Sequence, residues 1–279
     1  MNNERAAQAF ADIFAANVEQ KRHWYSPAAE AYNAVRPKYP DEIIAFAVDA
    51  AGLTAASRLL EIGCGPGTAT IAFASRGCSI LAVEPNPDFC AIAQRNCAAY
   101  PDVRFHNCAF EELPVESGSF DCVLAATSMH WVSADIAYKK AAEALTSDAH
   151  LVLLWNMVLR LSDEANQQFL PVYRSRVPDL LRPEADSQET QILQLNRSAQ
   201  IALDTGLFKD LQTTSRVGHL VYSADEYLRL LTTYSQYIAL DATTREELFA
   251  DIRAIIIEQF AGSLALTSRS ACHVARKAS

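Results

Sequence analysis

The stretch of this chain that most constrains its fold is Leu59–Thr68, which reads Leu-Leu-Glu-Ile-Gly-Cys-Gly-Pro-Gly-Thr. Its apolar start predicts a buried strand, and three glycines at alternate positions predict an abrupt turn before a helix. Glycine lets a backbone approach a ligand closely because it has no Cβ. Glu61 stands near the end of this strand, where its carboxylate can accept hydrogen bonds. We expect the turn to hold a small, partly cationic, nucleoside-like ligand.

From this turn onward, apolar stretches alternate with helical ones. Strands are predicted at 58–62, 79–84, 103–106, 120–126 and 150–155, and helices at 41–51, 67–76, 86–98 and 133–145. The strands are apolar on both faces and separated by helices, which is typical of a parallel sheet covered on two sides. The pattern therefore predicts a doubly wound α/β domain.

The segment 157–205 departs from this alternation. It is polar and helix-prone, it is broken by Pro171, Pro178 and Pro183, and it has no strand-like run. We expect a helical lid or substrate insertion over the edge of the sheet that binds ligand. After it, strands are predicted at 211–222 and 264–275, and helices at 224–232 and 243–260.

Composition narrows the class of protein. The chain has 279 residues, half of them apolar, and no apolar run of the roughly 18 to 20 residues that a membrane span needs. Its net charge of −9 argues weakly against nucleic-acid binding, which requires local Lys and Arg. The seven cysteines include no C-x-x-C pair, so we expect reduced, mostly buried thiols and no metal site. With no signal sequence at its start, the chain is expected to be cytoplasmic and to need no membrane.

The spacing of the glycines helps to distinguish which kind of cofactor the turn binds. Gly63-x-Gly65-x-Gly67 is tighter than the G-x-G-x-x-G of dinucleotide-binding folds, and no Lys-Ser/Thr follows to bind phosphate. An acid before the first glycine suits an ammonium group and would repel a pyrophosphate. Glu84, at the end of the second predicted strand, can accept both hydroxyls of a ribose, as acids also do in NAD-binding folds. An NAD-dependent dehydrogenase is therefore disfavoured.

Several motifs occur together along the chain. They are the glycine turn 61–68, Glu84-Pro85, Ala-Phe-Glu-Glu-Leu-Pro at 109–114, Ser-Phe-Asp at 119–121 and Ser-Met-His-Trp-Val at 128–132. In this combination the chain resembles class I S-adenosylmethionine-dependent methyltransferases. Ala-x-x-x-x-Arg-Pro-x-Tyr-Pro at 31–40 and Tyr-x-x-Leu-Leu-x-Thr-Tyr-Ser at 227–235 resemble the branch containing trans-aconitate methyltransferase.

The resemblance covers most of the chain and implies its architecture. It implies a Rossmann-like, mostly parallel seven-stranded sheet whose last strand is antiparallel. The whole chain, 1–279, would form a single methyltransferase domain, with 1–40 as an N-terminal helical cover and 157–205 as the lid.

The resemblance also implies a set of residues that bind S-adenosylmethionine. They are Tyr32, Arg36, Glu61, Gly63, Cys64, Gly65, Gly67, Glu84, Pro85, Ala109, Phe110 and Thr127. Residues 63–65 would approach the methionine part and Glu84 would hold the ribose. Ala109 and Phe110 would flank the adenine, with the Phe110 N–H facing ring N1. Many relatives have Asp in place of Ala109, and that side chain accepts from the adenine amino group.

Tyr32 and Arg36 would lie in the N-terminal cover, where Arg36 is a candidate partner for the cofactor carboxylate. For Tyr32, simple packing of an aromatic side chain is a competing interpretation.

His130 is the candidate catalytic residue, because it follows the fourth predicted strand, where a parallel sheet exposes its ligand edge. Its imidazole could remove a proton from a hydroxyl or amine acceptor. The alternative is a ring bonded to local backbone beside a packing Trp131. A carboxylate acceptor needs no base, because it is already ionised.

The sequence favours a methyltransferase acting on a small molecule, with a carboxylate among the candidate acceptors. Arginines at 160, 174, 176, 182, 216 and 229 are candidates for binding an anionic acceptor, although most are expected to be solvated. The alternatives are an RNA or protein acceptor, or a non-catalytic protein that binds S-adenosylmethionine. The pattern identifies neither the acceptor nor the oligomeric state.

Overall fold

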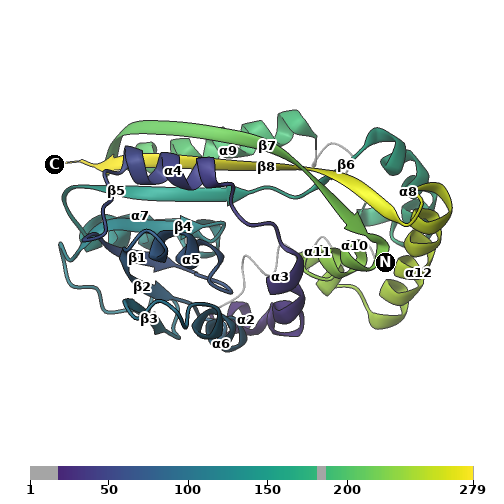
Figure 1. Ribbon diagram of the computed structural model, residues 1–279, viewed down its shortest axis with the longest axis horizontal. Coiled ribbons are helices and arrows are strands. Elements are labelled where there is room, and N and C mark those ends of the chain that lie inside the picture. The colour runs from purple at the N-terminus through teal and green to yellow at the C-terminus, as the bar shows by residue number, and fades with distance from the viewer. Residues whose placement is uncertain (1–17, 181–186, 279) are drawn as a thin grey trace. The chain divides into compact units, whose positions relative to one another are not determined.

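The computed structural model describes residues 18–180 and 187–278, which fall into two compact units (Figure 1). The first unit contains the residues up to Arg36, Met157–Gln191 and Val217–Arg269. The second contains Pro37–Asn156, Ile192–Arg216 and the residues from Ser270 onward. Within the described ranges, no helix has both the length and the apolar character needed to span a membrane.

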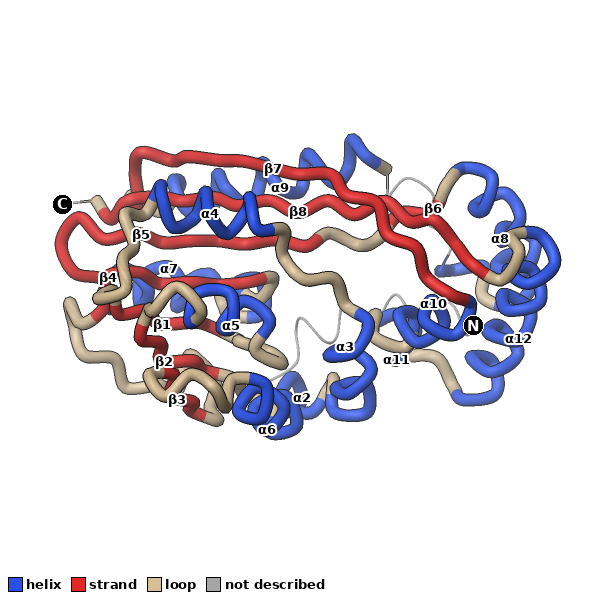
Figure 2. The backbone as a smooth tube through the Cα atoms, in the orientation of Figure 1, coloured by secondary structure: helices blue, strands red, loops and turns tan. Residues whose placement is uncertain are grey.

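The second unit is built on a mostly parallel sheet. Its strands are β1 (Arg58–Ile62), β2 (Ser79–Val83), β3 (Val103–His106), β4 (Phe120–Ala126) and β5 (Leu145–Asn156). They lie in the order β3-β2-β1-β4-β5, and each neighbouring pair is parallel (Figure 2). Strand β8 (Ser263–Lys277) follows β5 in the sheet and runs antiparallel to it, from His150 opposite Arg276 to Asn156 opposite Ser270.

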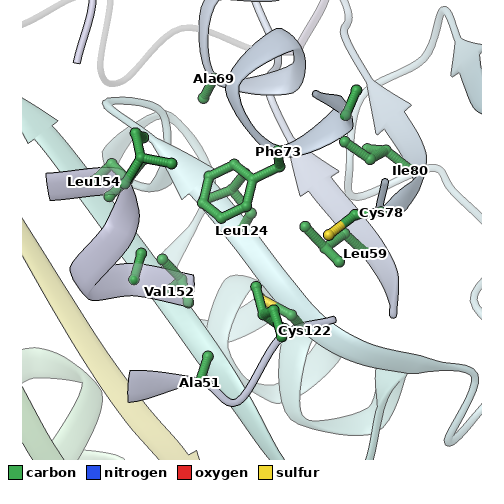
Figure 3. Close-up of a cluster of buried hydrophobic side chains, with 14 of the residues drawn as sticks. Ala51, Leu59, Ala69, Phe73, Cys78, Ile80, Cys122, Leu124, Val152 and Leu154 are labelled. Atoms are coloured by element: carbon green, nitrogen blue, oxygen red, sulfur yellow. The ribbon is translucent and has the colours of Figure 1, made fainter. Parts of the chain in front are cut away.

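Alternate residues of these strands enter two separate hydrophobic cores, as the two-residue period of a strand requires. Leu59 packs on the face covered by α4 (Asp41–Ala50), α5 (Thr68–Ala74) and α6 (Pro87–Asn96). Leu60 packs on the opposite face, with α7 (Ala134–Ala144) and the end of α9 (Gln188–Asp204). In the first core, the ring of Phe73 lies beside Leu124 and Leu154 (Figure 3). A sheet buried on both faces explains why its strands are apolar throughout.

The first unit is largely helical and has its own core. Its elements are α2 (Val18–His23), η1 (Ser26–Ala28), α3 (Ala29–Val35), β6 (Arg160–Leu161), α8 (Asp163–Arg176), η3 (Pro178–Leu180), α10 (Ala224–Leu231), α11 (Ser235–Ile238) and α12 (Ala242–Gln259), with parts of α9, β7 (Phe208–Ser223) and β8. Helix α12 packs against α8 and α10, and α10 packs against α3. Phe169, Tyr227 and Ile252 are among the side chains buried in this core.

The doubly wound Rossmann-like fold and the antiparallel last strand are confirmed. The predicted strands and helices of 41–156 agree with the structure to within a few residues, except that β5 begins five residues earlier, at Leu145.

Two expectations about 157–205 are wrong. The segment does contain a strand, β6, whose Arg160 and Leu161 pair with Thr267 and Leu266, so the sheet has eight strands instead of seven. Two residues are too few to show a period in sequence. Pro171 also does not interrupt the helix, because it lies inside α8. The Ser162 hydroxyl caps the start of α8 by accepting the Ala165 N–H at 3.1 Å. Burial of Phe169 in the core holds this helix together despite its proline.

The single domain over 1–279, with a cover at 1–40 and a lid at 157–205, stays a prediction. Of the cover, the structure describes the residues from Val18 onward; of the lid, it describes all but 181–186.

Candidate functional site

The glycine turn follows β1, and each of its three glycines adopts a left-handed conformation, with φ of 64° at Gly63, 55° at Gly65 and 86° at Gly67. A Cβ at Gly63 would lie 2.7 Å from the Ser128 Cβ, and one at Gly67 would lie 3.2 Å from the Cys97 Sγ. A Cβ at Gly65 would meet no atom within 4 Å. Packing therefore excludes a side chain at Gly63 and leaves little room for one at Gly67, whereas the space beside Gly65 is open to a ligand.

Glu84, directly after β2, is fixed against this turn. Its Oε2 accepts the Gly65 N–H at 2.8 Å, and its Oε1 accepts the Asn86 N–H at 2.8 Å. Burial raises the pKa of the Glu84 carboxyl to about 7, although both N–H hydrogen bonds oppose the rise. The same carboxylate thus orders the glycine turn and stands at the end of β2, where the sequence predicts a ribose.

Glu61, on β1, is completely buried. The Thr70 hydroxyl donates to its Oε2 at 2.6 Å, whereas its Oε1 has no hydrogen-bond partner among the described residues. Burial raises the pKa of Glu61 to about 8; the Thr70 hydrogen bond opposes this rise, and the charge of Glu84 adds to it. A buried carboxyl oxygen without a partner is costly, so it calls for a donor or a cation from a ligand.

These residues fit a nucleoside that carries a cationic amino-acid group. The open space at Gly65 admits a ligand, the partnerless Glu61 oxygen suits an ammonium, and Glu84 suits a diol. Cys64, between two of the glycines, is buried, and its Sγ–H donates to the Gly65 carbonyl at 3.6 Å. Burial, with the charges of Glu61 and Glu84, raises the pKa of the Cys64 thiol well above its ordinary value, so this thiol is a poor nucleophile.

The loop after β3 lies next to Glu84. Asn107 Nδ2 donates to the carbonyls of Glu84 at 2.8 Å and Pro85 at 3.1 Å. Ala109 and Phe110 follow it and are both buried. The structure therefore brings Pro85, Ala109 and Phe110 to the same edge as the glycine turn; their contact with an adenine stays a prediction.

Thr127, after β4, lies at this edge as well and has a left-handed φ of 57°, uncommon for a residue other than glycine. Its hydroxyl oxygen lies 2.7 Å from the Tyr39 hydroxyl and accepts the Asn156 N–H at 3.1 Å. Backbone strain of this kind concentrates at functional sites. Sequence reasoning missed Tyr39 and Asn156 as residues that position Thr127; the Tyr-Pro pair at 39–40 was the available signal.

His130 lies in η2 (Met129–Trp131), at the same ends of the strands as Thr127. Its ring centroid lies 5.5 Å from that of Trp131 and 5.7 Å from that of Trp155. His130 is exposed to solvent, yet the groups around its ring desolvate it and lower its pKa to about 4. The imidazole is therefore neutral near pH 7 and able to accept a proton.

Tyr32 and Arg36 belong to the first unit. The Arg36 guanidinium donates from Nε to the Thr233 hydroxyl at 2.8 Å and from Nη2 to the Thr233 carbonyl at 2.7 Å. Its Cζ lies 4.7 Å from the centroid of the Tyr32 ring and 4.2 Å from that of Tyr234. Both predicted residues are thus ordered as a pair by cation–π stacking, and their predicted role toward the cofactor stays a prediction.

Two of the six candidate arginines bind partners among the described residues. Arg176 forms ion pairs with Glu247 and with Asp251 at 2.8 Å, and Arg216 donates to the Ser215 carbonyl at 2.9 Å. Arg176 is therefore a poor candidate for an acceptor anion. Arg182 lies outside the described residues.

Known proteins that are similar to this chain in sequence are described as methyltransferases. Residues 59–148 match the family described as a methyltransferase domain. An uncharacterized methyltransferase of Mycobacterium tuberculosis is 34% identical over 132 residues, which are 47% of this chain and 51% of that protein. The chain thus spans about half the length of the curated relatives it matches.

Solved structures share the fold. A candidate type II methyltransferase from Anaeromyxobacter dehalogenans superposes with a TM-score of 0.62 and 21% identity, covering 87% of this chain and 98% of that one. A phosphoethanolamine N-methyltransferase of Haemonchus contortus, solved with S-adenosylhomocysteine, gives 0.52 and 17% identity, covering 94% and 59%. Residues 59–148 are therefore similar to methyltransferase domains in sequence, and the solved structures share the fold.

Proposed function

We propose that this protein is an S-adenosylmethionine-dependent methyltransferase that acts on a small molecule. The observation that carries the proposal is the buried Glu84 carboxylate, which bridges Gly65 and Asn86 at the ends of two neighbouring parallel strands. Ligands of open α/β sheets bind beyond the carboxyl ends of the strands. A carboxylate fixed there can accept both hydroxyls of a ribose.

Each remaining residue of the set has a proposed role. The backbone of Gly63, Cys64, Gly65 and Gly67 approaches the methionine part, and the Glu61 Oε1 accepts from its ammonium group. Pro85, Ala109 and Phe110 flank the adenine, and Thr127 lies on the acceptor side of the cofactor. Tyr32 and Arg36 cover it, with the cofactor carboxylate as the partner of Arg36.

When bound, the cofactor supplies a methyl group on a sulfonium, which a nucleophile attacks in line. The chain aligns the two reactants and excludes water, and no bond to the protein forms. For a hydroxyl or amine acceptor, His130 takes the proton, since its lowered pKa keeps the imidazole neutral. A carboxylate acceptor, as the resemblance to the trans-aconitate branch suggests, needs no base.

Two other functions remain to be separated from this one. An RNA or protein acceptor is disfavoured by the net charge of −9. A non-catalytic cofactor-binding protein gains some support from Ala109, which lacks the side-chain acceptor for adenine that many relatives have.

Calorimetry with S-adenosylmethionine and S-adenosylhomocysteine tests the cofactor, and we expect dissociation constants in the micromolar range. Transfer of a labelled methyl group to small carboxylates, small amines and alcohols, RNA and protein then tests the acceptor. Label appearing in small molecules supports the proposal, and label confined to RNA or protein contradicts it. His130→Ala should abolish transfer to a hydroxyl or amine and leave cofactor binding unchanged; unchanged transfer would assign the ring to packing.

A further inference from the structure

We propose that the carboxylate of Glu112 recognises the amino group of the cofactor's adenine, in place of the side chain that Ala109 lacks. The inference rests on the proposed function, because it assumes that the adenine lies at the loop after β3. It assigns a determinant of base specificity to a residue outside the predicted binding set.

The position of the base follows from that of the ribose. Strand β2, with Glu84 at its end, lies between β1 and β3. The methionine part extends toward the glycine turn after β1, so the base extends the other way, over the end of β3. There Asn107 ties the loop to the Glu84 and Pro85 carbonyls. The next residues along the chain are Ala109 and Phe110.

The Glu112 carboxylate reaches the backbone N–H of Ala109. Its Oε2 accepts this N–H at 3.0 Å. In an aspartate at position 109, only the Cα and one methylene would separate the carboxylate from the same N–H, so an acceptor there would lie close by. Ala109 itself is buried, whereas Glu112 is exposed and can reach around the turn.

A lysine side chain lies beside this turn. Lys140, on α7, donates to the Glu111 carbonyl at 3.0 Å, and its Nζ lies 5.2 Å from the centroid of the Phe110 ring. This places a positive charge beside the turn that holds Glu112. An ionised carboxylate only accepts hydrogen bonds, and the adenine amino group only donates, so the two are complementary.

A purely structural role for Glu112 is the competing explanation. Residues 109–113 form a single turn in which the N–H groups of Glu112 and Leu113 bond to the Ala109 carbonyl at 3.0 and 3.2 Å. In a capping box, two hydrogen bonds link the first residue of the turn and the glutamate three residues later. The bond from the Ala109 N–H to the Glu112 carboxylate is one of the two, and it forms whatever the side chain of residue 109. If Glu112 only capped this turn, its loss would weaken every ligand of the site equally, whether or not the base of the ligand has an amino group.

The test compares two ligands by calorimetry: S-adenosylhomocysteine, and its 6-deamino counterpart, in which hydrogen replaces the amino group and ring N1 is kept. We expect Glu112→Ala to weaken S-adenosylhomocysteine about tenfold and to leave the deamino ligand unchanged. Adding Ala109→Asp to the Glu112→Ala protein should restore S-adenosylhomocysteine alone. Glu116→Gln, an exposed acid nearby, is the control and should change neither ligand.

Equal weakening of both ligands, or no weakening of either, would overturn the role of Glu112 while leaving the proposed function intact. Failure of the unaltered protein to bind S-adenosylhomocysteine would overturn the proposed function and this inference together. Circular dichroism of the Glu112→Ala protein distinguishes a folded variant from an unfolded one, and Glu112→Gln, which keeps an acceptor, should lose less affinity than Glu112→Ala.

Discussion

At the scale of single residues, two buried acids at the ends of neighbouring strands differ in their partners. Both oxygens of Glu84 accept backbone N–H groups, whereas Glu61 has one hydroxyl donor and one oxygen with no partner among the described residues. Each oxygen of Glu84 thus has a backbone donor and can still accept a ligand hydroxyl, because a carboxylate oxygen has more than one acceptor site, whereas the second oxygen of Glu61 is left for a ligand to satisfy. This difference explains why a site for a cation can exist beside a carboxylate that also orders the backbone.

The raised pKa of Glu61 makes the stability of the ligand-free protein depend on pH. In the folded protein the pKa of the Glu61 carboxyl is about 8, whereas that of an ordinary glutamate is 4.5, so Glu61 keeps its proton over most of this range. The stabilising contribution of this group is therefore complete below pH 4.5 and is lost as pH rises toward 8. Relative to the unaltered protein, Glu61→Gln should gain unfolding free energy over this range, on the order of a few kcal/mol. Urea unfolding at three pH values between 5 and 8 measures this difference.

The exposed Glu116→Gln is the control for that measurement and should run parallel to the unaltered protein at every pH. If the unfolding free energy of the Glu61→Gln protein had the same pH dependence as that of the unaltered protein, the pKa of Glu61 would not be raised in the folded state.

Gly65 offers a second prediction, because Gly52 provides a matched control. Both glycines have left-handed φ, 55° and 62°, and a Cβ at either would meet no atom within 4 Å. Replacement by Ala should therefore cost each folded protein a similar strain of about 1 kcal/mol. Only Gly65→Ala should weaken S-adenosylhomocysteine, by about tenfold or more, because its methyl group occupies ligand space. Equal affinity of the two variants in calorimetry would remove Gly65 from the site.

At the scale of elements, α8 shows how tertiary burial overrides local preference. Pro171 removes a backbone donor inside the helix and crowds the carbonyl four residues earlier, yet α8 runs from Asp163 to Arg176. Phe169 and Ala165, buried in the core of the first unit, supply the compensating free energy. Pro171 thus destabilises the helix, and the packing of α8 in the core offsets this loss of free energy.

Replacing Pro171 by Ala should accordingly raise the free energy of unfolding by about 1 to 3 kcal/mol. Pro178→Ala, at the first position of η3, is the control, because proline is tolerated at the first turn of a helix and little change is expected there. Thermal unfolding followed by circular dichroism compares the two. A Pro171→Ala protein no more stable than the Pro178→Ala protein would mean that α8 has adapted to its proline.

At the scale of the whole molecule, the glycine turn, both buried acids and the loop after β3 lie together in one compact unit. Glu61, Gly65, Glu84 and Phe110 belong to the second unit, and Arg36 belongs to the first. Hydrogen exchange with and without S-adenosylhomocysteine should show protection at 63–67, 84–86 and 109–113, since a bound ligand suppresses local opening.

The same experiment tests the predicted cover. Protection of 29–36 would support it, whereas protection confined to the second unit would argue that the Arg36–Thr233 contact is purely structural. The segment 245–258 of α12 provides an internal control, since no predicted site residue lies in it and its exchange should not change.

The sequence by itself determined the alternation of strands and helices, the glycine turn and the acids at 61 and 84, because these depend on local spacing and on burial of both sheet faces. It could not predict β6, whose two residues show no period, or the helix through Pro171, which depends on distant packing. Only the tertiary structure decided where packing limits the space beside a glycine, through Ser128 at Gly63 and Cys97 at Gly67, since these side chains come from other elements.

The tertiary structure also decided that Thr70 satisfies one oxygen of Glu61 and none of the described residues satisfies the other. It decided that Glu112 folds back to Ala109, a contact that a motif of consecutive letters does not reveal. The physical reason is the same in both cases. A sequence specifies which groups can donate or accept, whereas hydrogen-bond partners and burial depend on where the fold brings each group.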